Sequence, residues 1–191
     1  MSTWTSKAAA LLASLALAAC QVEGGFGTSR SVPVLDGALN VGVPAGYCVD
    51  RGASREGNGA AVVIMGRCSS EATVPPAVVT VSVGRAGSAG VTAAGGAAMA
   101  AWFTSAEGRK ALSRDGRASD VRVHQAISSG DALLLHVTDR RVGTYWRAIT
   151  GKKGRLITLS ATGTPRVPLD PAAGRRVIDQ LLAALSRANA G

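Results

Sequence analysis

Residues 144–161 read Thr-Tyr-Trp-Arg-Ala-Ile-Thr-Gly-Lys-Lys-Gly-Arg-Leu-Ile-Thr-Leu-Ser-Ala, which is two runs around the turn Gly151-Lys-Lys-Gly154. Both runs are rich in β-branched and aromatic residues, which fit the half-buried surface of a strand. The gap between them is short and bounded by glycine, as in a tight hairpin. We therefore predict two antiparallel strands joined at residues 151–154.

Similar runs occur on the N-terminal side of this hairpin, each bounded by turn residues. The clearest is residues 78–83, where Val79, Val81 and Val83 alternate with Val78, Thr80 and Ser82. The other predicted strands are residues 39–43, 60–66, 121–124 and 133–138. The short glycine-bearing gaps after residue 121 favour antiparallel pairing.

Two segments follow helical periodicity. In residues 97–113, Met99, Trp102 and Phe103 recur at helical spacing. Near the C-terminus, Asp170 can cap a helix that begins at Pro171 and carries an apolar stripe. The stripe consists of Val177, Ile178, Leu181, Leu182 and Leu185. The order of elements predicts an α+β fold, an antiparallel sheet packed against two helices.

The remaining segments are expected to be irregular. Residues 20–37 contain several glycines and serines and are expected to form a flexible tether. Residues 44–48 are expected to form a turn, residues 50–59 a polar loop and residues 84–96 a small-residue loop. Residues 38–191 would then make one domain, a length that suits a single core.

The N-terminus carries a targeting signal. Lys7 precedes an apolar run from Ala8 to Ala19, which closes with Leu17-Ala-Ala-Cys20. This ending resembles the lipobox of bacterial lipoprotein signal peptides. The resemblance implies that residues 1–19 are removed and that Cys20 receives lipid, palmitate included. An ordinary secretory signal is the alternative.

The lipoprotein resemblance also implies a location. In that family an aspartate after the lipidated cysteine tends to retain the protein in the inner membrane. The next residue here is Gln21, which implies the periplasmic face of the outer membrane. The order of elements over residues 38–188 further resembles the PsbP-like fold, with the opening Leu39-Asn-Val-Gly-Val-Pro-Ala-Gly46. No functional residue is implied by that fold.

Two cysteines remain after Cys20. Disulfides persist in an oxidising compartment, so Cys48 and Cys68 are expected to pair. The bond would close a loop of about 20 residues and stabilise the fold by about 3 kcal/mol in the chain-entropy model. Two buried free thiols are the alternative.

The chain is basic, with 21 Lys and Arg against 12 Asp and Glu and a formal net charge of +9. Export argues against nucleic acid as the partner, and favours an envelope protein or an anionic envelope component. Cations at the predicted hairpin turns form a candidate anion-binding rim, provided that the turns share one end of the sheet. They are Arg140, Arg141, Lys152, Lys153 and Arg155. Solvated cations without a ligand are the alternative.

No catalytic or cofactor motif stands out. His124 and His136 could bind a metal with Asp120 or Asp139 only if the sheet brought them together. Ser129, His136 and Asp139 are the three residues from which a triad could be built. We expect no metal, no cofactor and no enzyme activity. The sequence predicts a binding or accessory lipoprotein, with a periplasmic hydrolase or a binder of lipopolysaccharide or envelope polymer as alternatives.

Overall fold

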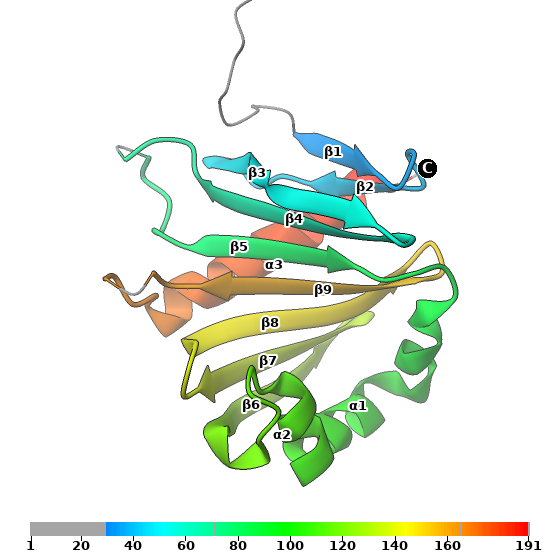
Figure 1. The fold of residues 1–191 in the computed structure, drawn as a ribbon, viewed down its shortest axis with the longest axis vertical. Helices are drawn as coiled ribbons and strands as arrows, with labels where there is room; N and C mark the ends of the chain where they lie inside the picture. Colours follow the sequence, from blue (N-terminus) through cyan, green and yellow to red (C-terminus); the bar gives the residue numbers. More distant parts are fainter. Residues whose placement is uncertain (1–29, 71, 165, 191) are drawn as a thin grey trace, which may run out of the picture.

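The predicted hairpin lies inside a seven-stranded antiparallel sheet with the order β3-β4-β5-β9-β8-β7-β6. In this computed structural model, which describes residues 30–70, 72–164 and 166–190, β8 (Gly143–Lys152) pairs with β9 (Arg155–Thr162). The other strands are β3 (Tyr47–Gly57), β4 (Ala60–Arg67), β5 (Val78–Val83), β6 (Val121–Ser129) and β7 (Ala132–Asp139). Figure 1 shows their order across the sheet.

A second, two-stranded sheet precedes this one. β1 (Ser31–Val34) pairs antiparallel with β2 (Leu39–Gly42). Val34 and Leu39 are buried in the core beside the large sheet. The prediction of a tether up to residue 37 is therefore wrong for residues 31–37, because the apolar residues among them pack into the domain. Residues 20–29 of the predicted tether lie outside the described residues.

The predicted turn forms at residues 44–47, where the Tyr47 amide donates a hydrogen bond to the Pro44 carbonyl oxygen at 3.1 Å. The structure corrects the predicted loop at residues 50–59. Most of this segment belongs to β3, an edge strand whose register with β4 shifts between Asp50 and Arg55. Side chains hold the irregularity. The Asp50 carboxylate accepts a hydrogen bond from the Ala53 amide (2.9 Å), and the Ser54 hydroxyl oxygen accepts one from the Ile64 amide (3.0 Å).

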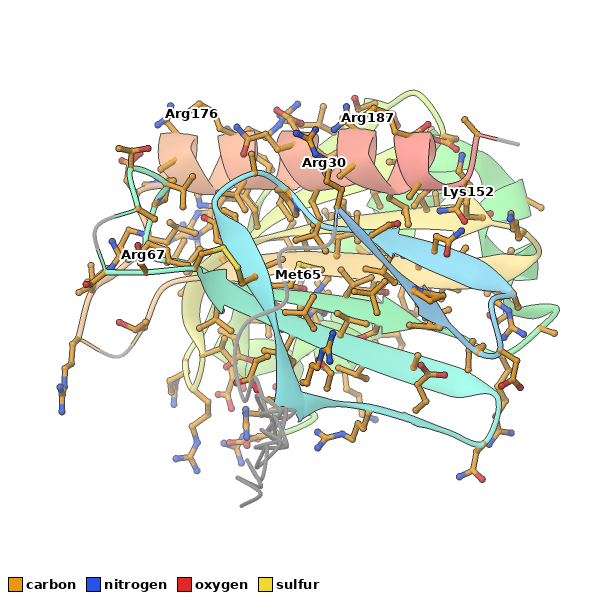
Figure 2. All side chains as sticks on the ribbon, turned by 90° about the horizontal axis from the view of Figure 1, so that it is seen from above. Arg30, Met65, Arg67, Lys152, Arg176 and Arg187 are labelled. Atoms are coloured by element: carbon orange, nitrogen blue, oxygen red, sulfur yellow. A yellow bond between two sulfur atoms is a disulfide. The ribbon has the colours of Figure 1, made fainter. Side chains whose placement is uncertain are left out.

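The C-terminal helix α3 (Pro171–Ala188) forms as predicted and covers one face of the sheet. The Asp170 carboxylate accepts a hydrogen bond from the Ala173 amide at 2.8 Å and caps the helix. Its apolar stripe packs on sheet residues such as Met65. Arg176 and Arg187 lie on the exposed side of the same helix (Figure 2).

The predicted helix over residues 97–113 is interrupted. It consists of α1 (Gly95–Thr104) and α2 (Ala106–Leu112), and the 3₁₀ helix η1 (Ser88–Ala94) occupies the predicted loop before it. Ser105 is extended and its hydroxyl oxygen accepts a hydrogen bond from the Gly108 amide. A Cβ on Gly108 would collide with the Trp102 carbonyl oxygen, so this corner requires glycine.

The described residues thus contain three α-helices rather than the two predicted, and the α+β class is confirmed. α1 contacts β6 and β7, and Figure 1 shows it with α2 at the β6 edge, while α3 crosses the sheet. A second 3₁₀ helix, η2 (Ala118–Asp120), leads into β6. Within the described part of the chain, no helix is long and apolar enough to cross a membrane.

The predicted disulfide is confirmed. Cys48 and Cys68 are bonded, with their Cα atoms 4.9 Å apart. Cys48 lies inside β3 rather than in a turn, and Cys68 directly follows β4. The bond therefore ties the edge strand to its neighbour in the sheet order.

Candidate functional site: a groove beneath the first helix

A groove of about 620 Å³ lies between α1 and the sheet, on the face opposite α3. Its lining is apolar except for two residues, Arg147 and Thr158. The apolar lining residues are Val91, Ala94, Ala98, Met99, Trp102, Phe103, Ala111, Leu112, Ile149 and Leu156. This combination of size, apolar lining and few polar groups is typical of sites that bind small molecules.

The sequence of α1 leaves this space open. The helix reads Gly-Gly-Ala-Ala-Met-Ala-Ala-Trp-Phe-Thr, and Met99 is its one buried residue. Alanine side chains at the other facing positions are too short to fill the gap to β8 and β9. Val91 and Trp102 stay 59% and 47% exposed at the rim. Trp102 therefore does not reach the core, whereas Tyr145 and Trp146 are buried on opposite faces of β8.

Arg147 supplies the charge in the groove. It shares a face of β8 with Tyr145 and Ile149. Its Nε donates a hydrogen bond to the Ser160 hydroxyl (3.1 Å), and its guanidinium carbon lies 5.1 Å from the centre of the Tyr145 ring. None of the ion pairs within the described residues involves Arg147. Its charge is therefore available to a ligand in the groove.

The candidate anion-binding rim is not assembled. Arg140 and Arg141 lie in the turn between β7 and β8, whereas Lys152, Lys153 and Arg155 lie around the turn between β8 and β9. Successive hairpin turns lie at opposite ends of an antiparallel sheet. The five cations consequently form two separate groups.

The cations of each turn also have protein partners. Arg141 pairs with Asp115 at 2.9 Å and Arg140 with Asp120 at 3.7 Å. The hydrogen bond from Arg141 lowers the pKa of Asp115.

At the other end, Lys152 lies 3.8 Å from the Asp131 carboxylate. Arg155 donates to the carbonyl oxygens of Gly59 and Gly84, both at 2.9 Å. These contacts hold neighbouring loops together, which is a structural role. Lys153 lies exposed at the tip of its turn.

The two histidines are adjacent, with ring centres 5.1 Å apart. His136 stacks on Trp146 at 4.8 Å, and His124 Nε2 hydrogen-bonds the Thr138 hydroxyl at 2.8 Å. Burial, with the charge of His124 as a lesser cause, lowers the pKa of His136. Within the described residues, no group of three or more His, Cys, Asp and Glu side chains could hold a metal.

The residues considered for a triad are also kept apart. His136 lies on the face that α3 covers, whereas Asp139, three residues further along β7, points to the other face. The Asp139 carboxylate accepts hydrogen bonds from the amides of Arg114, Arg141 and Val142. Ser129 pairs with Ala132, at the opposite end of β7 from Asp139. No Ser-His-Asp arrangement forms from them.

The groove was not identified from the sequence. Its walls come from η1, α1, α2, β8 and β9, and no local pattern indicates that they meet. One usable signal was the charged Arg147 between Tyr145 and Ile149 on the same face of a predicted strand.

Comparison with known proteins finds a distant likeness. No protein-family model matches the chain, and no curated protein matches it. Among solved structures, the chain is similar to a point mutant of the protein Mog1, with 15% sequence identity and a TM-score of 0.48. The match covers 83% of this chain and 93% of that one.

Proposed function

We propose that this protein is a lipid-anchored binding module of the bacterial cell envelope that acts without catalysing a reaction. The observation that carries the proposal is the groove beneath α1. Its apolar side chains and Arg147 offer shape, dispersion contacts and a fixed positive charge. Such a lining recognises a ligand, and it contributes no group that titrates near neutral pH as a general acid or base would.

The anchor in this proposal is Cys20, which lies outside the described residues. Support comes from the resemblance of residues 17–20 to the lipobox. Two or three acyl chains on one residue give stable attachment to a bilayer. Residues 20–29 would reach at most about 35 Å, so the domain stays close to the membrane. With Gln21 after the lipidated cysteine, we place it on the periplasmic face of the outer membrane.

The geometry favours this function over the two alternatives. A hydrolase working at His124 or His136 needs a nearby carboxylate, and Asp139 points to the opposite face. A binder of lipopolysaccharide or envelope polymer through a single basic rim needs both turns at one end of the sheet, and they lie at opposite ends.

In-cell crosslinking followed by membrane extraction and mass spectrometry tests the proposal. The informative variant is Ala98→Phe, which fills the groove from α1. Ala97→Phe is the matched control, because Ala97 is exposed on the same helix and does not line the groove. We expect one envelope component to crosslink to the parent and to Ala97→Phe, and to be lost with Ala98→Phe. Equal crosslinking by all three proteins would contradict a role for the groove.

A further inference from the structure

We propose that the groove binds a long-chain fatty acid, with the acyl chain along α1 and the carboxylate on Arg147. This inference rests on the proposed binding role of the groove and names its ligand class. Three features support it: an apolar channel, a charge whose terminal nitrogens are free of ion pairs within the described residues, and a helix that buries little side-chain surface.

The channel fits an acyl chain. Met99, Leu112 and Ile149 are almost fully buried where α1 and α2 meet the sheet, and they form the deep side of the groove. The exposed side chains of Val91 and Trp102 extend the apolar surface to the rim. Each methylene transferred from water to such a surface strengthens binding by roughly fourfold.

The head-group position is given by Arg147. Its Nε is occupied by Ser160, while none of the ion pairs of the described residues engages its terminal nitrogens. A guanidinium fork matches a carboxylate with two parallel hydrogen bonds. A cation beside apolar walls also gains more from an anion than a solvated cation does, since the local dielectric constant is lower. Charge complementarity therefore selects an anionic amphiphile over a neutral one.

The second polar residue of the groove agrees with this placement. Thr158 pairs with Ile149 across the β8–β9 ladder, so it lies on the strand next to Arg147. Its hydroxyl can donate a hydrogen bond to a carboxylate oxygen. The cavity beside α3 is less suited to an anion with a long chain, because Asp131 and Asp179 line it and it measures about 270 Å³.

The features of α1 suit local opening of the helix, which would admit the ligand to the groove. This helix begins with Gly95-Gly96, has no side-chain cap at Ala94 and buries only Met99. A helix that buries so little side-chain surface opens locally at lower cost than a well-buried one. Movement of α1 would admit a chain that is longer than the rim is wide.

Isothermal titration calorimetry with sodium laurate tests the inference. The full chain carrying Cys20→Ala is used, because it keeps the protein free of its own lipid and of detergent. We expect one laurate per protein. Arg147→Gln keeps a donor for Ser160 but removes the charge, and is expected to weaken laurate binding roughly tenfold or more while leaving dodecanol binding unchanged. Arg147→Lys is expected to retain part of the affinity.

Two controls separate local from general effects. Arg122→Gln removes an exposed charge outside the groove and is expected to leave laurate binding unchanged. Ala98→Phe is expected to weaken laurate and dodecanol alike, whereas Ala97→Phe weakens neither. Circular dichroism melts establish that each variant is folded.

The inference is overturned if the folded parent binds no laurate, if it binds dodecanol as tightly, or if Arg147→Gln behaves like Arg122→Gln. In any of these cases the crosslinking experiment still reports on the wider proposal. A crosslinked partner that is lost with Ala98→Phe would keep the groove as a binding site for another ligand, such as a protein segment. If the protein neither binds laurate nor loses a crosslinked partner with Ala98→Phe, both the fatty-acid inference and the proposed binding role of the groove are refuted.

Discussion

Asp139 is almost fully buried, and its carboxylate accepts hydrogen bonds from the amides of Arg114, Arg141 and Val142. Asp139→Ala leaves the amides of Arg114 and Arg141 without this acceptor, while the Val142 amide keeps the main-chain carbonyl oxygen of residue 139 at 3.2 Å. We expect the free energy of unfolding to fall by about 2 kcal/mol, since a donor that loses its acceptor away from bulk water costs about 1–3 kcal/mol. Urea denaturation measures the change.

Asp131→Ala is the control for this experiment. Its side chain is 73% exposed and makes one ion pair, with Lys152 at 3.8 Å. We expect a change within about 0.5 kcal/mol. If the two alanine variants lose the same stability, the amide contacts of Asp139 are not what holds the turn between β7 and β8.

His136 makes stability depend on pH. Its pKa is lowered from 6.5 in the folded state, mainly by burial, so the unfolded chain takes up a proton at a higher pH than the native protein does. Stability from this group is complete above pH 6.5 and decreases as the pH falls through that value. His136→Phe keeps the stack on Trp146 and removes the titration. We expect the free energy of unfolding, measured by chemical denaturation, to fall less between pH 7 and 5 in His136→Phe than in the parent. The same pH dependence in both proteins would refute this role of His136.

For Arg147, the sequence predicted the strand and the face on which the side chain lies, but not the groove beside it. The strand and its period were predicted, and they put Arg147 on the same face as Tyr145 and Ile149. What makes it a site is the space left by the alanines of α1, about fifty residues earlier in the chain. By contrast, Cys48 and Cys68 were predicted to pair because the cysteine count and the expected export leave few alternatives, and they are bonded.

Among the elements, α1 and α3 differ most in how they are held. α3 has an Asp170 cap and buries seven residues, whereas α1 has no side-chain cap and buries one. We therefore expect amide hydrogens of α1 to exchange much faster than those of α3, by roughly a hundredfold or more. Hydrogen–deuterium exchange with mass spectrometry measures both. Equal protection of the two helices would contradict the proposed opening of α1.

The disulfide acts on the edge of the sheet. It joins β3 to the residue that follows β4, at the regularly paired end of the two strands, whereas the register shifts further along β3, between Asp50 and Arg55. The double variant Cys48→Ala, Cys68→Ala is expected to lose about 3 kcal/mol of stability, in line with the loop that the bond closes. Thermal and urea unfolding of the oxidised parent and the variant provide the measurement. A variant as stable as the parent would show that the edge strand is held by its other contacts alone.

The elements that were predicted well are those whose pattern is local. β8, β9 and α3 have clear periodicity and marked turns or caps. β3 was missed because residues 51–57 are polar and mostly exposed at a sheet edge, so they resemble a loop. The break between α1 and α2 depends on the close approach of Gly108 to Trp102, which only the folded chain reveals.

At the scale of the whole molecule, the two faces of the sheet are covered unequally. α3 packs against β8 and β9 on one face, and α1 contacts β6 and β7 on the other (Figure 1). The groove lies beside α1, over β8 and β9. At both ends of the sheet, acidic partners meet cations of the hairpin turns. We propose that this groove belongs to a binding module tied to the membrane through Cys20.

The most direct test is the intact mass of the protein extracted from membranes, read together with its N-terminal peptide. The account predicts a chain that begins at Cys20 and carries the added mass of a diacylglyceryl group. It also predicts that Cys20→Ala is neither lipidated nor cut before residue 20. An unmodified chain, or one that begins at another residue and is found equally in the membrane fraction with and without Cys20, would contradict the account.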